Sequence, residues 1–194
     1  MKKAYLWLLA AALAGALTGC SSAASGTDAG EVIVYNWGEY VDPDVLEMFE
    51  EETGIRVIYD EFETNEIMYP KVEAGASEYD VICPSDYMIQ KMIENDLLAE
   101  LNFDNIPNAK ANIGEQYWEQ SQGFDPENKY SVPYCWGTVG ILYNKTKVEE
   151  PVDSWSILWD ETYQDSILMQ DSVRDAFMVA LKLNGDSMNS TDPD

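Results

Sequence analysis

The sequence predicts an α/β fold built on a mostly parallel sheet with helices on both faces. From Glu31 onward, short runs of β-branched and aromatic residues alternate with segments whose apolar residues recur at helical spacing. Capping and turn residues stand at the boundaries between these segments. In sheets of this kind, ligands bind beyond the carboxyl ends of the strands.

The first strand and the first helix follow directly after Glu31. Residues 32–35 form a β-prone run, and residues 36–41 form the loop after it. Asp42 is placed to cap a helix that begins at Pro43, and Gly54 is placed to end it. The expected apolar face of this helix consists of Val45, Leu46, Met48 and Phe49.

Two further strand and helix pairs complete the pattern. Residues 55–62 predict a strand, and residues 65–74 predict a helix in which Pro70 causes a kink or a late start. Residues 79–83 predict the third strand. The helix after it ends near Asn95, and its apolar residues are Met88, Ile89, Met92 and Ile93.

A long β-prone run, residues 130–144, predicts a passage from one lobe to another. We assign residues 31–134 to the first lobe, residues 135–144 to a crossover strand and residues 145–194 to part of a second lobe. These last 50 residues are too few for a stable α/β lobe of their own. We therefore expect a second lobe that is incomplete in this chain.

Within the second lobe, the pattern predicts a short helix at residues 155–163 and a strand at residues 166–169. A longer helix follows and is ended by Gly185. One face of it carries Val173, Phe177, Ala180 and Leu181. We expect this face to remain exposed or to associate with another chain, because few residues are available to cover it.

The first 20 residues are typical of a lipoprotein export signal. Two lysines precede an apolar run too short to span a bilayer, and the lipobox Leu17-Thr18-Gly19-Cys20 follows. Acylation of Cys20 would place the protein on the outer face of the cell membrane or in the periplasm, with residues 21–30 as a flexible tether. The alternative is an ordinary secretory signal that is cleaved after a small residue.

The charge of the chain excludes nucleic acid as a partner. The sequence has 11 basic and 36 acidic residues, a net charge of −25. Loss of the signal removes two basic residues and no acidic one, which lowers this charge to −27. A nucleic-acid binder needs a basic surface, whereas an acidic one favours cationic ligands. Acidic residues also keep exported proteins soluble, so charge alone identifies no site.

The residue types limit the chemistry further. There is no histidine, which removes Ser-His-Asp and Cys-His nucleophilic sites and most zinc sites. Cys83 and Cys135 lie in apolar runs and are expected to be core thiols, although a disulfide between them stays open in an exported protein. We expect no cofactor, no metal site and no enzymatic activity.

Three groups of candidate binding residues follow predicted strands. They are Trp37, Glu39 and Tyr40; Ser85 and Tyr87; and Asp171 or Ser172 together with Asp175. Aromatic faces and carboxylates together suit a ligand that consists of ammonium groups on a methylene chain. Structural roles compete with this interpretation. The aromatic residues could belong to the core, Asp86 could cap a helix, and acids are favoured at a helix N-terminus.

Five successive motifs resemble those of the spermidine/putrescine-binding lipoproteins, the extracytoplasmic components of ABC importers. The motifs are Val34–Val41, Phe49–Gly54, Tyr79–Val81, Pro84–Tyr87 and Ser131–Gly137. The similarity runs from about Glu31 to the last residue. It implies a type II periplasmic-binding-protein fold, in which two lobes with a mostly parallel sheet each close by a hinge on a polyamine and deliver it to a membrane permease.

The resemblance also implies ligand contacts at the three groups of candidate residues. Two departures bear on the choice between a diamine and a triamine: Gly38 replaces a common hydroxyl residue, and Ser172 occupies the position of an acid. The alternatives are another small solute, such as an organic cation or a metal chelate, and a secreted carboxylate-dependent hydrolase. No spacing of acids in the sequence singles out the pair that such a hydrolase needs.

Overall fold

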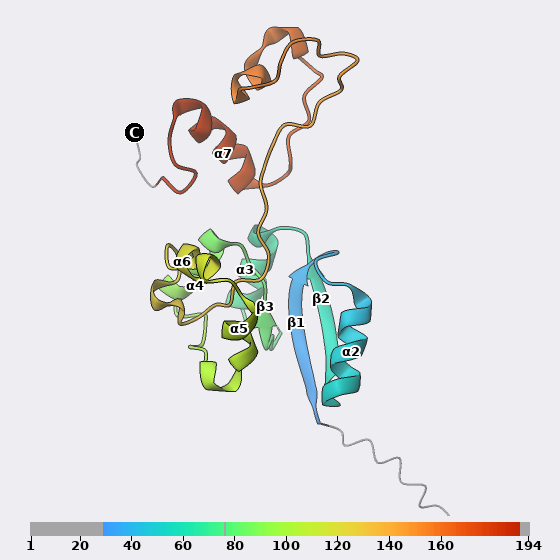
Figure 1. The fold of residues 1–194 in the computed structure, drawn as a ribbon, viewed down its shortest axis with the longest axis vertical. Coiled ribbons are helices and arrows are strands. Elements are labelled where there is room, and N and C mark those ends of the chain that lie inside the picture. Colours follow the sequence, from blue (N-terminus) through green and yellow to red (C-terminus); the bar gives the residue numbers. More distant parts are fainter. Residues whose placement is uncertain (1–28, 76, 191–194) are drawn as a thin grey trace, which may run out of the picture.

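The computed structural model describes residues 29–75 and 77–190. They form a main body, residues 29–134, and a second part, residues 145–190, joined by a connecting stretch, residues 135–144 (Figure 1). The predicted export signal with Cys20 and most of the predicted tether lie outside the described residues.

A three-stranded parallel sheet organises the main body, as the sequence predicts. Its strand order is β2-β1-β3, with β1 (Glu31–Trp37) in the centre. β2 (Arg56–Phe62) pairs along the whole of β1, whereas β3 (Val81–Ile82) pairs only with Val34 and Tyr35. The carboxyl ends of the strands face the second part of the chain (Figure 1).

The first helix, α2 (Pro43–Thr53), has the predicted ends but not the predicted burial. Asp42 accepts a hydrogen bond from the Asp44 N–H at 3.0 Å, and Gly54 ends the helix at φ 73°, where a side chain would be strained. However, α2 buries none of its residues. Its expected apolar face is largely exposed, with Val45 at 52%, Met48 at 65% and Phe49 at 39%. Spacing predicts which residues share a helix face, and burial depends on what lies opposite.

Helices α3 (Asn65–Glu73) and α4 (Asp86–Glu94) cover the sheet and enclose the core. α3 begins at Asn65 because Thr64 caps it, and it continues through Pro70. Of the two expected effects of Pro70, a kink or a late start, the late start was therefore wrong. α4 ends at Asn95, as predicted. The buried cluster consists of Tyr35, Phe62, Met68, Tyr69, Met88 and Met92.

The rest of the main body consists of short helices: η1 (Phe103–Asn105), α5 (Pro107–Asn112), α6 (Glu115–Ser121) and η2 (Pro126–Asn128). The fully buried carboxylate of Asp125 holds the chain at residues 129–131, where it leaves these short helices. It accepts hydrogen bonds from the backbone N–H groups of Lys129, Tyr130 and Ser131 and from the Ser131 hydroxyl, at 2.7–3.1 Å. The start of the run toward the second part is therefore held in one conformation.

Two predicted strands are absent from the structure. Neither the crossover strand at residues 135–144 nor the strand at residues 166–169 forms, and both segments are irregular chain. A strand needs a neighbour for its backbone hydrogen bonds. No strand lies within residues 145–190 to provide one, so the second sheet is not formed. Leu142 and Leu168 are 101% and 97% exposed as a result.

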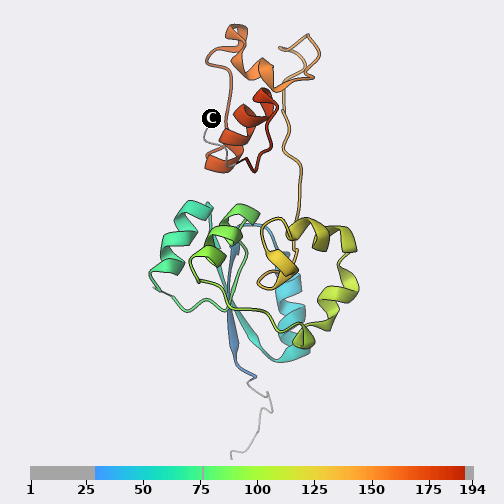
Figure 2. The ribbon, with the colours of Figure 1, turned by 90° about the vertical axis from the view of Figure 1, so that its left-hand side faces the viewer.

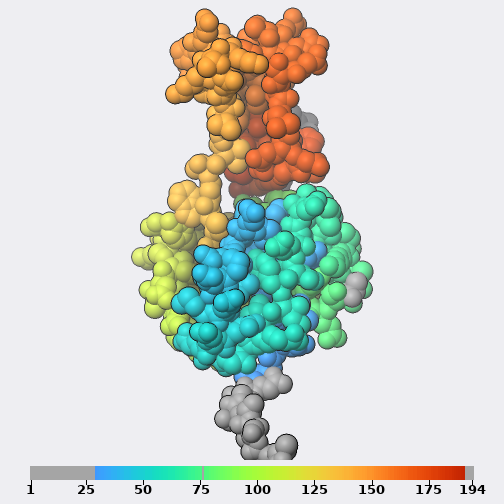
Figure 3. All heavy atoms as spheres, turned by 90° about the vertical axis from the view of Figure 1, so that its right-hand side faces the viewer, coloured from blue at the N-terminus to red at the C-terminus, as the bar shows by residue number. Residues whose placement is uncertain are grey.

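The second part contains η3 (Trp155–Trp159), η4 (Glu161–Tyr163) and α7 (Val173–Asn184). The predicted helix is confirmed, with Ser172 as its cap and Gly185 at φ 89° at its end. Val173 and Phe177 are 56% and 67% exposed, as expected for this face, whereas Ala180 and Leu181 are half-buried. Figure 2 shows this part above the main body, and Figure 3 shows a narrow waist between the two. No helix within residues 29–75 and 77–190 is long and apolar enough to cross a membrane.

Candidate ligand-binding site

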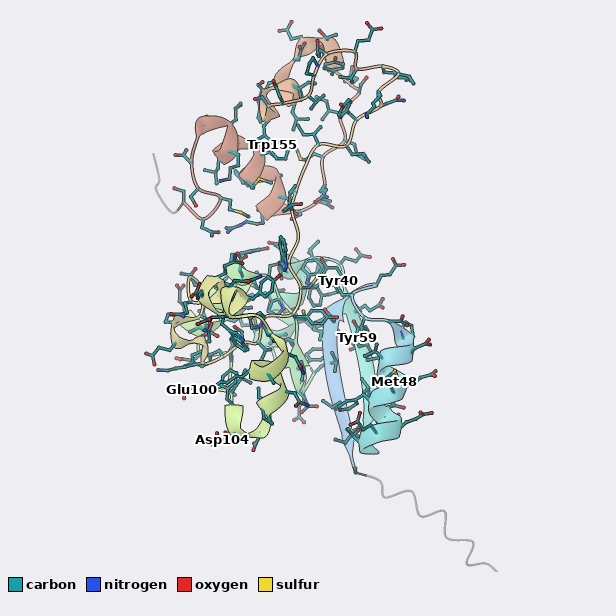
Figure 4. The ribbon with its side chains drawn as sticks, in the orientation of Figure 1. Tyr40, Met48, Tyr59, Glu100, Asp104 and Trp155 are labelled. Carbon is teal, nitrogen blue, oxygen red and sulfur yellow. The ribbon has the colours of Figure 1, made fainter. Side chains whose placement is uncertain are left out.

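The candidate site lies at the carboxyl ends of two neighbouring strands. β1 ends at Trp37, and the turn at residues 38–40 follows it. β3 ends at Ile82 and leads into the start of α4. Because β1 and β3 are paired, these two loops lie side by side. Figure 4 shows Tyr40 at this end of the sheet, on the side of the second part.

The first loop brings Trp37 and Tyr40 together. Their ring centroids are 6.0 Å apart, and the Trp37 ring also lies 4.7 Å from the buried Phe62 ring. Trp37 thus packs against the core on one side and against the loop residue Tyr40 on the other. Glu39 is exposed at φ 59°, a conformation that costs a non-glycine residue about 1–2 kcal/mol. The buried side chain of Asn36 accepts a hydrogen bond from the Trp37 N–H at 2.8 Å and holds the loop start.

The second loop brings Ser85 and Tyr87 together through Asn65, which is 3% exposed. The Asn65 amide donates to the Ser85 hydroxyl and to the Tyr87 hydroxyl, both at 3.0 Å, and its oxygen accepts from the Ser85 N–H at 3.2 Å. Asn65 was not predicted as a site residue, because in the sequence it marks only the start of a helix. It could have been found from its position after the second strand, because that strand ends at the same edge of the sheet as the other two.

Helix α4 uses Ser85 as its cap position, so the structural alternative for Asp86 was wrong. Asp86 is instead the first helical residue, and its carboxylate accepts from the Tyr87 N–H at 2.7 Å. An acid in the first turn is still favoured by the helix dipole. Ser85 makes no side-chain hydrogen bond to the helix, which leaves its hydroxyl facing Asn65.

Tyr87 is held as a neutral hydrogen-bond donor. Its hydroxyl donates to the Glu66 carboxylate at 2.8 Å. Burial raises the pKa of Tyr87 to about 12, and the contact with Glu66 acts in the same direction. The phenol therefore stays protonated at physiological pH. Glu66, a second residue that was not predicted for the site, adds a carboxylate beside this aromatic ring.

The third group lies at the start of α7. Ser172 accepts a hydrogen bond from the Asp175 N–H at 3.4 Å and caps the helix, so it has a structural role. Asp175 is half-buried and Asp171 is exposed. Arg174 stands between these two acids in the sequence, and its guanidinium lies 5.0 Å from the centroid of the Tyr87 ring. This contact brings the first turn of α7 close to the second loop.

Residues of the connecting stretch line a hollow beside the first loop. It has a volume of about 430 Å³ and is lined by Glu39, Tyr40, Cys135, Trp136 and Gly137. Small-ligand sites commonly measure about 300–1,000 Å³. The Tyr134 hydroxyl donates to the Tyr40 carbonyl and ties the stretch to the loop. Trp136 was not predicted as a site residue, although it belongs to a motif that carries the family resemblance.

The two cysteines have different surroundings, and both are free thiols. Cys83 is half-buried, and burial raises its pKa to about 11, with a smaller effect from the nearby Cys135. Cys135 is exposed, so the expectation of a core thiol was wrong for this residue. The stretch that carries it has no partner strand to bury its side chains. Among the described residues, no group of three or more acids or cysteines is suited to a metal ion.

Two protein-family models match this chain. A model of bacterial extracellular solute-binding proteins matches residues 77–191. A model of a hypothetical lipoprotein family, the MG045 family, matches residues 1–123. Each match covers more than half of the chain.

Individual relatives agree with these matches. The chain is 40% identical over 197 positions to a spermidine/putrescine-binding periplasmic protein of Salmonella typhimurium, covering 100% of this chain and 54% of that protein. A spermidine/putrescine ABC transporter substrate-binding protein of Streptococcus pneumoniae matches with 45% identity and a TM-score of 0.69, covering 84% of this chain and 50% of that one. The TpPotD lipoprotein of Treponema pallidum matches with 31% identity and a TM-score of 0.76 over the same shares.

The chain spans about half the length of the curated relatives it matches. These matches agree with the parallel sheet of the main body and with the predicted export signal. The chain therefore belongs to the bacterial extracellular solute-binding proteins, which work outside the cytoplasm as binding proteins and not as enzymes.

Proposed function

We propose that this protein captures polyamines of the spermidine/putrescine class outside the cytoplasm and delivers them to an ABC permease. The observation that carries the proposal is the first loop, where the Trp37 and Tyr40 rings lie 6.0 Å apart beside the exposed carboxylate of Glu39. Relatives named for binding spermidine and putrescine support this choice of ligand.

The side chains suit the two kinds of surface that a polyamine has. Its methylene chain packs against aromatic rings, and its ammonium groups interact with aromatic faces and carboxylates. One cation–π contact contributes about 0.5–2 kcal/mol, so several contacts must act together. In this proposal, Trp37 and Tyr40 contact the chain, and Glu39 binds an ammonium group. Ser85 and Tyr87 line the adjacent loop.

The second part contributes the opposing wall of the site. Asp171 and Asp175 carry carboxylates at the start of α7, the end of the helix that lies over Tyr87. Ser172 orients this turn by capping it. A carboxylate that meets an ammonium group away from water forms a charge-assisted hydrogen bond, roughly twice as strong as a neutral one. The half-buried Asp175 is therefore the stronger candidate of the two acids.

The proposed function also requires two lobes that can close on a ligand. We assign residues 31–134 to one lobe of a type II periplasmic-binding-protein fold and residues 145–194 to part of the other, with residues 135–144 as the crossover. The lobes close on the ligand by a hinge. The TM-score of 0.76 to the TpPotD lipoprotein supports this architecture. Closure excludes water, which strengthens each ammonium–carboxylate contact.

We further propose that lipidated Cys20 anchors the protein to the membrane beside its permease. The lipobox and the match of residues 1–123 to a lipoprotein family support this anchor. The formal charge of −27 after loss of the signal attracts cations to the membrane-bound protein, because a field of this sign raises the local concentration of cationic ligands.

Calorimetry on the full-length protein, with the signal and Cys20 removed, tests the proposal. Spermidine and putrescine should bind and be recovered unchanged. 1,4-Butanediol has the carbon chain of putrescine without its charges and serves as the matched control, which should not bind. Absence of heat with both amines, or equal binding of the diol, would contradict the proposed function.

A further inference from the structure

A cation of the chain itself occupies the aromatic face of Tyr87. Arg174 is the second residue of α7, and its guanidinium lies 5.0 Å from the ring centroid, within the range of about 6 Å for cation–π contacts. The Tyr87 ring packs against the buried cluster of the main body, and its hydroxyl is held by Glu66 and Asn65. The main body therefore presents this ring, and Arg174 covers it.

The position of Arg174 is unfavourable for the helix that carries it. A positive charge in the first turn opposes the helix dipole, whereas Lys182 lies in the favourable last turn of the same helix. The Arg174 Nε is buried and has no hydrogen-bond partner among the described residues, although the guanidinium also donates to the Asn189 side chain. A buried group of this kind calls for an explanation. The contact with Tyr87 provides one.

We propose that Arg174 determines which polyamine the site accepts, because its guanidinium covers a ring that would otherwise bind an ammonium group. The inference rests on the proposed function, since it concerns the ligand preference of the same site. A triamine gains affinity from a third ammonium group only if the Tyr87 ring is free to contact that group. Arg174 covers the ring, and its positive charge repels the ammonium group. A diamine does not need this position. The protein should therefore favour putrescine more than a variant without this charge does.

The test compares three variants of the full-length protein by calorimetry with spermidine and putrescine. Arg174→Gln removes the charge and keeps a polar side chain of similar length. Lys182→Gln removes an equal charge from the exposed far end of the same helix and controls for net charge. Arg174→Lys keeps the charge.

Arg174→Gln should tighten spermidine binding by about 2- to 30-fold, the equivalent of one cation–π contact, and should leave putrescine binding unchanged. Arg174→Lys and Lys182→Gln should match the wild type with both amines. Unchanged or weaker spermidine binding in Arg174→Gln would overturn the proposal, and so would an equal gain for both amines.

A ligand-free measurement separates this inference from the proposed function. In the NMR spectrum of the free protein, the Arg174 Hε signal should be shifted upfield by the Tyr87 ring, and Tyr87→Leu should abolish the shift. If the wild type binds neither amine, the proposed function fails, whatever this signal shows. An unshifted Hε signal in a protein that does bind spermidine rejects the role of Arg174 alone.

Discussion

The main body and the second part use their apolar side chains differently. In the main body, a sheet and two helices enclose six buried residues. In the second part, α7 buries Met178 and Val179, while Leu168 and Phe177 are 97% and 67% exposed. Residues 32–35 and 166–169 are both β-prone, yet only the first run becomes a strand. A β-prone run therefore needs a partner strand as much as it needs its own residues.

The largest expected effect tests this difference in packing. In the chain of residues 21–194, Met92→Ala should lower the free energy of unfolding by about 2–5 kcal/mol, because Met92 is fully buried and the change leaves a cavity. Phe177→Ala removes an exposed ring and should cost about 0.5 kcal/mol or less. Urea titration followed by circular dichroism measures both. Equal losses would show that the second part is packed as well as the main body.

The next effect concerns what each region contributes to binding. In the full-length protein, Asp175→Asn should weaken spermidine binding by about 1.5–3 kcal/mol, the value of a hydrogen bond to a charged group. Trp37→Phe keeps an aromatic face and should cost about 0.5–1 kcal/mol. Calorimetry compares the two variants. Wild-type affinity in Asp175→Asn would remove the second part's acid from the site.

Local signals in the sequence were sufficient for the ends of elements. Asp42, Gly54 and Gly185 act through their own side chain or their own backbone conformation, and all three predicted helix ends are confirmed. Helical spacing likewise placed Met88 and Met92 among the apolar residues of one helix, and the structure buries both. Features that depend on a distant partner were not accessible in this way. The strand at residues 166–169 and the exposure of α2 both depend on what lies opposite.

The same distinction holds for the candidate site. Trp37 and Tyr87 were identified because they follow strands, which is a local property. Asn65 was missed because its role depends on a loop 20 residues further along the chain. Arg174 stood between two predicted acids and was passed over, since only the folded chain brings it to Tyr87. The sequence pattern thus predicts at which edge of the sheet the candidate residues lie, and the fold determines which side chains meet there.

A smaller effect compares two carboxylates that accept backbone hydrogen bonds in the two regions. Asp125→Asn should cost about 1–3 kcal/mol of stability, because a fully buried acceptor of several N–H groups is replaced by one that also carries donors. In the second part, Asp160 accepts from the Thr162 N–H at 2.8 Å on the surface. Asp160→Asn should have no measurable effect, since Asn caps as well as Asp does. Urea titration that ranks the two variants in the opposite order would contradict the comparison.

The smallest effect distinguishes the two thiols, one in the main body and one on the connecting stretch. Only the thiolate reacts with iodoacetamide, and burial raises the pKa of Cys83 to about 11. At pH 8, about one molecule in a thousand carries this thiolate, and each added pH unit should raise the rate at Cys83 about tenfold until pH 11. Cys135 is exposed and should react first. Mass spectrometry of peptides from alkylated protein measures both rates, with Cys135→Ser as the control that isolates Cys83. Equal rates at pH 8 would show that residues 79–83 open to solvent as freely as the connecting stretch does. The main body would then not be better packed than the rest of the chain at this edge of its sheet.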